Sequence, residues 1–191
     1  LSFSEPMVKA WIEGRKTVTR RLVKAAIVPL LEKSCQVNGF PAIHLLDFDI
    51  KTPYEPGETV YVKEAWSVAA WRVGQVDLYY SDEKKPIAKN ASAQFITSLD
   101  IDEHKWHPGK SNKYDPFRIR SPRFMPEWAS RSHALIVSVR PERIKDITIE
   151  ESMKEGFTLP LVCGFIPLWE KIHPGSWERN DWVWRIELEK K

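Results

Sequence analysis

The sequence predicts a mainly β fold with peripheral helices, an α+β arrangement in which a small barrel is decorated by helices. Short segments rich in β-branched and aromatic residues are separated by turn signals, while the helical patterns between them are few and short. At 191 residues, with 42% hydrophobic and 29% charged residues, the chain has a globular composition and the length of one domain. We therefore expect a single domain over residues 1–191, with a long irregular surface insertion at about 81–116.

The chain is predicted to open with a short helix followed by a strand. Ser4 is a favourable N-cap residue, and Pro6 fits the first turn, where its missing N–H is harmless. Gly14 is suited to end this helix, because glycine easily adopts the backbone conformation found there. Residues 16–23 alternate imperfectly with period two and are rich in β-branched residues, which favours a strand. Residues 30–33 follow as a predicted helical turn.

The central part of the chain is predicted to consist of strands and irregular segments. Strands are expected at 42–49, at 59–63 directly after a Pro-Gly turn, and at 76–80. Residues 81–116 are polar and without clear periodicity, so they are expected to form the surface insertion. Residues 117–131 contain two prolines between arginines, which indicates a loop.

The C-terminal part contains the clearest elements. Residues 134–140 form the strongest strand pattern, and residues 181–189 alternate as expected of a half-buried strand. Residues 148–156 predict a helix, with a capping-box pair at its start and a glycine at its end. A further helix is expected at 166–173.

Positive charge is concentrated in two segments. The net charge of +3 and the sequence pI of about 8.8 are too small to identify a polyanionic partner. However, residues 14–24 contain five basic residues and no acid, and residues 118–131 contain four arginines and one acid. This distribution favours a local anion site, with a solvated basic face as the alternative.

The composition excludes several classes of protein. No apolar run approaches the roughly 18 residues that a membrane span needs. The N-terminal residues lack the basic start and apolar stretch of a signal peptide. Cys35 and Cys163 are too few for a disulfide framework, so both are expected to be reduced thiols. We therefore expect a soluble, cytoplasmic protein.

Lys16 and Thr19, inside the first basic segment, form the most informative motif. Gly14 allows a turn between helix and strand, after which both side chains are able to face one cleft. A partly buried lysine can lose its proton near neutral pH and activate a hydroxyl. The same spacing also fits a basic strand edge in which threonine is present for its β-propensity.

The spacing Gly14-x-Lys16-x-x-Thr19-x-Arg21 resembles the Gly-x-Lys-x-x-Glu/Thr-x-Arg signature of the ASCH domain, a member of the PUA-like β-barrel superfamily. The resemblance implies a PUA-like barrel that holds RNA or a nucleotide in a basic cleft beside the first helix. Lys16 and Arg21 would then neutralise phosphate or contact a base edge.

Other parts of the chain extend this resemblance. Residues 56–62 resemble a turn and strand common in the group, and residues 125–131 and 177–184 resemble the larger ASCH-type proteins often encoded in phages and prophages. Together with the basic segments, these features predict a set of nucleic-acid contacts: Arg15, Lys16, Arg20, Arg21, Arg123, Trp128 and Arg131.

A narrower resemblance implies catalysis. Some small bacterial ASCH proteins that this sequence resembles are amidohydrolases acting on N4-acetylcytidine. Carried over by position, Lys16 would activate Thr19, Thr19 would attack the acyl carbon, and Glu155 would handle protons. No metal or cofactor is implied, and the metal-like spacing of His104 and His107 is attributed to chance.

Several functions therefore remain open from the sequence. The expected function is an RNA- or nucleotide-binding ASCH-like protein that uses a basic cleft, with RNA or a modified nucleoside as its partner and no membrane association. The alternatives are a metal-independent amidohydrolase that deacetylates N4-acetylcytidine, a ribonuclease, and a phage accessory interaction module without catalysis. The sequence predicts no particular protein partner.

Overall fold

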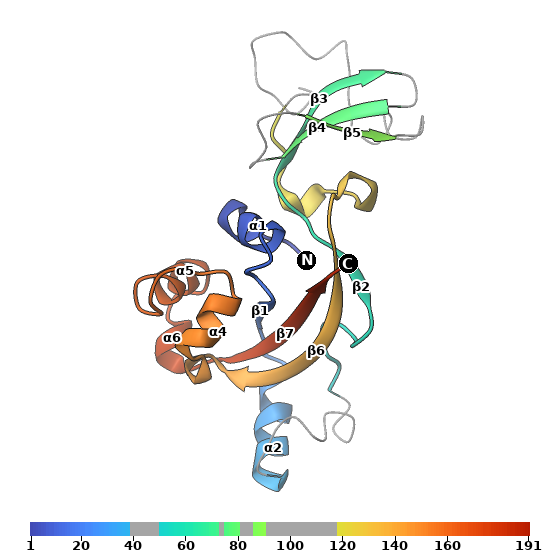
Figure 1. The fold of residues 1–191 in the computed structure, drawn as a ribbon. Helices are drawn as coiled ribbons and strands as arrows, with labels where there is room; N and C mark the ends of the chain where they lie inside the picture. Colours follow the sequence, from blue (N-terminus) through green and yellow to red (C-terminus); the bar gives the residue numbers. More distant parts are fainter. Residues whose placement is uncertain (39–49, 73–74, 81–85, 91–117) are drawn as a thin grey trace. The chain divides into compact units, whose positions relative to one another are not determined.

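The computed structural model in Figure 1 describes residues 1–38, 50–72, 75–80, 86–90 and 118–191. By their contacts the residues divide into two compact units, a first made of residues 1–9 and 61–133 and a second made of residues 10–60 and 134–191. Among the described helices, none combines the length and the apolar character that crossing a bilayer requires.

A curled sheet of four strands is the centre of the second unit. Its strand order is β1 (Val18–Leu22), β7 (Trp182–Lys190), β6 (His133–Arg143) and β2 (Thr59–Tyr61). The pairs β1–β7 and β6–β7 are antiparallel, and β6 curves strongly in Figure 1, so the sheet forms half of a barrel. The predicted α+β, barrel-like fold is confirmed at this level.

Two helices begin and end where the sequence predicts. Helix α1 (Glu5–Ile12) begins with a hydrogen bond to the Ser4 carbonyl oxygen (2.9 Å). Helix α4 (Ile149–Lys154) begins with the Thr148 hydroxyl oxygen, which accepts a hydrogen bond from a backbone N–H of the first turn. It ends before Gly156, whose φ of +96° suits glycine. The predicted cap at Thr148 is therefore confirmed, and Ser4 precedes its helix as predicted.

Three further helices belong to the second unit: α2 (Val28–Asn38), α5 (Phe165–Ile172) and α6 (Ser176–Arg179). Figure 1 shows α4, α5 and α6 grouped beside the start of β7. A buried cluster connects α5 with β7 and with a short 3-10 turn, η4 (Ile144–Asp146), and Trp177 of α6 packs against it. The cluster consists of Ile144, Ile147, Phe165, Trp169 and Val183. Helices α5 and α6 thus cover the face of β7 to which Val183 belongs.

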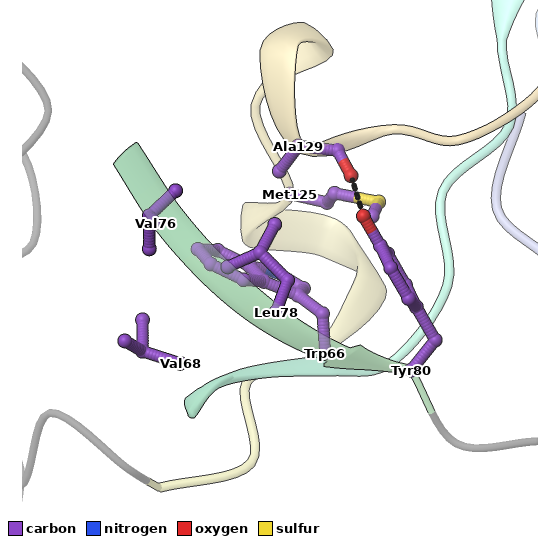
Figure 2. Packing of buried hydrophobic residues seen from close by; sticks show 7 residues of the cluster. All are labelled: Trp66, Val68, Val76, Leu78, Tyr80, Met125 and Ala129. Atoms are coloured by element: carbon purple, nitrogen blue, oxygen red, sulfur yellow. Dashed lines mark hydrogen bonds between the residues drawn. The ribbon is translucent and has the colours of Figure 1, made fainter. Parts of the chain in front are cut away.

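The first unit has its own sheet and core. The strands are β3 (Trp66–Arg72), β4 (Gln75–Tyr80) and β5 (Ile87–Asn90), followed by the 3-10 turns η2 (Pro122–Phe124) and η3 (Glu127–Ala129). Figure 2 shows Trp66, Leu78 and Tyr80 from the strands packed with Met125 and Ala129 from the segment that contains the turns. The Tyr80 hydroxyl donates a 2.6 Å hydrogen bond to the Ala129 carbonyl oxygen.

The structure corrects some of the predicted elements. Strand β3 was not predicted, because its serine and alanines have little β-propensity of their own and depend on pairing with β4. Residues 87–90, expected to be irregular, form β5 for the same reason. The predicted half-burial of the last strand is wrong, since Trp182 to Ile186 are all buried. The predicted strand at 42–49, the rest of 81–116 and the histidines at 104 and 107 lie outside the described residues.

Candidate functional site

The second unit brings Lys16 and Glu155 together in its interior. Lys16 lies just before β1, and Glu155 follows the last residue of α4. Lys16 Nζ donates to Glu155 Oε2 (2.8 Å), to the Glu155 carbonyl oxygen (3.0 Å) and to the Val18 carbonyl oxygen (2.8 Å). The two side chains are only 2% and 6% exposed. Three acceptors therefore match the three donors of the ammonium and fix its direction.

Burial and Glu155 act in opposite directions on the proton of Lys16. Burial lowers the pKa of Lys16 from its usual value, and this effect outweighs the Glu155 carboxylate, which raises it. The positive charges of Arg21 and Arg20 lower the pKa further. The three hydrogen bonds are those of the protonated amine. Because the pKa is lowered, Lys16 nevertheless loses its proton more easily than a lysine at the protein surface.

Arg20 connects Glu155 to two other carboxylates. Its side chain is 1% exposed. Arg20 Nη1 donates to Glu155 Oε1 (3.2 Å), Nε donates to Glu142 Oε1 (2.7 Å) and Nη2 donates to Glu151 Oε2 (3.0 Å). The two oxygens of Glu155 therefore face different cations, Oε1 facing Arg20 and Oε2 facing Lys16.

The ion-pair network continues across the sheet. Arg185 on β7 is opposite Arg20 in the register and donates from Nε (2.9 Å) and Nη2 (3.0 Å) to the two oxygens of Glu151. Hydrogen bonds from Arg185 first, and from Arg20, outweigh burial and lower the pKa of Glu151 to about 2. Arg185 also donates to Glu187 (3.2 Å). The members of this network are Lys16, Arg20, Arg140, Lys154, Arg185, Glu142, Glu151, Glu155 and Glu187. Its five cations and four carboxylates nearly balance, and each of its buried cations faces a carboxylate.

Thr19, the expected nucleophile, is buried but stands apart from this network. Successive side chains of a strand point to opposite faces, so Thr19 leaves β1 on the face away from Arg20. Among the described residues, no hydrogen bond joins the Thr19 hydroxyl to Lys16 or Glu155. Of the three expected catalytic residues, the structure thus links Lys16 with Glu155 but does not link Thr19 to either.

The neighbouring basic residues have different surroundings. Arg15 is exposed, and it donates to the carboxylate of Glu13 (2.8 Å from Nε) and to the Gly156 carbonyl oxygen (2.8 Å from Nη1). Arg21 is half-buried and is opposite Trp184 in the register. Lys16 and Arg20, by contrast, are buried, so the first basic segment is only in part a solvent-facing surface.

The remaining predicted contacts lie in the first unit. Arg123 is exposed on η2. Trp128 is half-buried, with its ring edge-on to Trp66 at 6.0 Å. Arg131 donates two hydrogen bonds to the buried carboxylate of Glu64 (2.8 and 2.7 Å), and its guanidinium lies 4.6 Å from the centre of the Tyr80 ring. The charge of Arg131 is therefore balanced within the protein.

The sequence reasoning missed Arg185, Glu142 and Glu151 as members of the network. One signal was available, since Glu151 and Glu155 are one helical turn apart and so lie on the same face of the predicted helix. Arg185 was assigned to the polar face of the last strand, because alternation does not tell what covers a face.

No protein-family model, no curated protein and no solved structure matches the chain. The chemistry of the site is therefore inferred from its own contacts. A buried amine whose pKa is lowered, beside a carboxylate held in place by an arginine, can exchange protons with a ligand or offer it directed hydrogen bonds.

Proposed function

We propose that the chain is an ASCH-like protein with a PUA-like barrel that binds an uncharged modified nucleoside, or an exposed base of RNA, beside Lys16 and Glu155. The observation that carries the proposal is the buried Lys16–Glu155 ion pair (2.8 Å), whose lysine lies at the lysine position of the ASCH-like signature. A nucleobase presents donors and acceptors along its edge, and an ammonium beside a carboxylate complements such an edge.

The pairing of Lys16 and Arg20 with carboxylates favours a base over a phosphate as the group bound at this site. The ammonium of Lys16 and all three nitrogens of Arg20 already donate to carboxylates, so a phosphate would have to displace these ion pairs. Phosphate groups of an RNA ligand are better matched to exposed basic side chains such as Arg15. The proposal thus narrows the expected basic cleft to a site for a neutral group, in which the buried cations are already paired with carboxylates.

The lowered pKa of Lys16 favours a second candidate function, hydrolysis of N4-acetylcytidine to cytidine and acetate with consumption of one water molecule. In its neutral form Lys16 would accept a proton from the attacking hydroxyl and pass it to Glu155, which would give it to the departing amine. Where Thr19 is the attacking group, the water molecule then cleaves the threonine ester and releases acetate. Since Thr19 is not linked to Lys16 in the described structure, the reaction requires Thr19 or a water molecule to approach Nζ when the ligand binds.

Calorimetric titration with cytidine, N4-acetylcytidine and a short single-stranded RNA tests the binding proposal. We expect Lys16→Met to weaken binding about tenfold or more, the effect of losing a charged hydrogen bond. Lys24→Ala is the matched control, because Lys24 is an exposed lysine of the same basic segment. The proposal fails if the unaltered protein binds none of the three ligands, or if both variants lose affinity equally.

Chromatographic detection of cytidine tests the second candidate. Incubation of N4-acetylcytidine with a high concentration of the protein should release cytidine, and Glu155→Gln should abolish the release. If no cytidine forms while N4-acetylcytidine still binds, hydrolysis is excluded and the binding proposal stands.

A further inference from the structure

The environment of Arg20 is unsuited to a nucleic-acid contact, although its place in a basic segment favours one. The side chain is 1% exposed, and all three of its nitrogens donate to carboxylates, those of Glu142, Glu151 and Glu155. An arginine so enclosed cannot reach a phosphate without breaking these ion pairs. Its role therefore has to be sought inside the network.

Arg20 controls the orientation of one carboxylate in particular. The terminal torsion of a glutamate is broad, so an isolated carboxylate can turn its plane and meet a neighbouring cation with one oxygen or with both. Here Nη1 of Arg20 engages Oε1 of Glu155, which leaves Oε2 for Lys16. The planar guanidinium is itself held by Glu142 and Glu151, so its direction is set in advance.

We infer that Arg20 is a positioning residue of the proposed site, one that holds Glu155 so that a single oxygen meets Lys16. This inference rests on the proposed function for its biological meaning, but its geometry is independent of any ligand. Because Glu155 binds both Arg20 and Lys16, it attracts Lys16 less strongly than it would in an isolated ion pair. Arg21 is a further positive charge near Lys16, and it lowers the pKa of Lys16 as Arg20 does.

Exchange of the Lys16 ammonium protons with water, followed by NMR of the ligand-free protein labelled at lysine, measures this positioning directly. Lys16→Met identifies the signal. Arg20→Lys keeps the positive charge, but a single ammonium cannot replace a fork that binds three carboxylates. We expect the exchange to become about tenfold faster and nucleoside binding to weaken by a similar factor.

Arg185→Lys is the matched control. Arg185 is buried opposite Arg20 in the register, and it contacts Glu151 and Glu187 rather than Glu155. Arg185→Lys keeps a positive charge beside Glu151 and leaves Glu151 bound to Arg20 Nη2, so Arg20 and Glu155 keep their places. We therefore expect this variant to change the Lys16 exchange by less than about twofold. Equal effects of the two variants, or no effect of Arg20→Lys, would overturn the inference.

A milder variant covers the case in which Arg20→Lys does not fold. Glu142→Gln removes the carboxylate that fixes Arg20 Nε and leaves both Arg20 and Glu155 present. It should accelerate the exchange in the same direction by about threefold, and an unchanged rate counts against the inference. Because exchange needs no ligand, faster exchange in a protein that binds no nucleoside would reject the proposed function and retain the positioning role.

Discussion

Lys16, Arg20 and Glu155 lie in a part of the protein from which water is largely excluded. Removing such charges from water costs several kcal/mol for each ion, and their mutual attraction compensates only when the geometry is good. An apolar set of residues would fill this space at no such cost. Stability alone therefore gives no reason for the buried pair, which agrees with the binding role proposed for Lys16.

Removal of the Glu155 charge should be strongly destabilising. Glu155→Gln leaves Lys16 buried without its carboxylate, and we expect the free energy of unfolding in urea to fall by about 3 kcal/mol. Glu150→Gln, on the exposed side of the same helix, should change it far less. If both variants lose the same free energy of unfolding, the buried Lys16–Glu155 pair contributes no more to stability than an exposed charge.

For single residues, the sequence predicted Lys16 and Glu155 as site residues but not the ion pairs that surround them. The ASCH-like signature indicated Lys16, and the same resemblance, carried over by position in the predicted helix, indicated Glu155. The role of Arg20 was not predicted, because strand alternation tells which face a side chain leaves and not what lies against that face. The Glu64–Arg131 pair joins residues 67 positions apart, for which no spacing rule exists.

Helix α4 is attached to the sheet by Glu151, which binds arginines of both β1 and β7. The pKa of the Glu151 carboxyl is about 2 in the folded protein, below its ordinary value of 4.5. The ionised carboxylate therefore stabilises the fold above about pH 4.5, and this contribution is lost as the pH falls from there towards 2.

Glu151→Gln should flatten the acid limb of the stability curve. Unfolding free energies measured by urea titration between pH 7 and pH 2.5 should differ between the two proteins by about 2 kcal/mol at neutral pH, allowing for solvent screening, and converge at the acid end. Parallel curves would show that another group determines the acid limb.

The end of α4 also packs closely against α1. A Cβ at Gly156 would lie 2.6 Å from Ala10 Cβ, at a φ of +96°. Gly156→Ala should therefore lower the free energy of unfolding by about 3 kcal/mol, through backbone strain and the clash together.

Gly57→Ala separates these two causes. Gly57 has a similar φ of +89°, but a Cβ there would meet nothing within 4 Å. We expect this variant to cost only about 1 kcal/mol in thermal or urea unfolding. If both alanines cost the same, the approach of α4 to α1 contributes nothing.

The elements that the sequence predicted are those whose signals are local. Caps such as Thr148 and glycines such as Gly156 fix helix ends through their nearest neighbours. Strands β3 and β5 were not predicted, because a polar or alanine-rich segment has little β-propensity of its own and forms a strand by pairing with another strand, here β4.

The molecule as a whole has two units with separate cores and a net charge of only +3. If base contacts rather than phosphate contacts dominate its affinity for RNA, binding should depend weakly on salt. We expect a plot of log K against log salt concentration for single-stranded RNA to have a slope of roughly −1, equivalent to one or two phosphates. A slope steeper than about −3 would indicate a phosphate-binding surface instead.

Strand β1 is an edge strand of its sheet, so the backbone groups on its outer side need partners other than a neighbouring strand. The carbonyl oxygen of Val18 is buried beneath the end of α4, and Lys16 is the donor that satisfies it. Exchanging this lysine for methionine removes that donor from a buried backbone acceptor, which costs about 1–3 kcal/mol. Urea unfolding of the Lys16→Met protein will therefore show whether a lower nucleoside affinity comes from a lost contact or from partial loss of the fold.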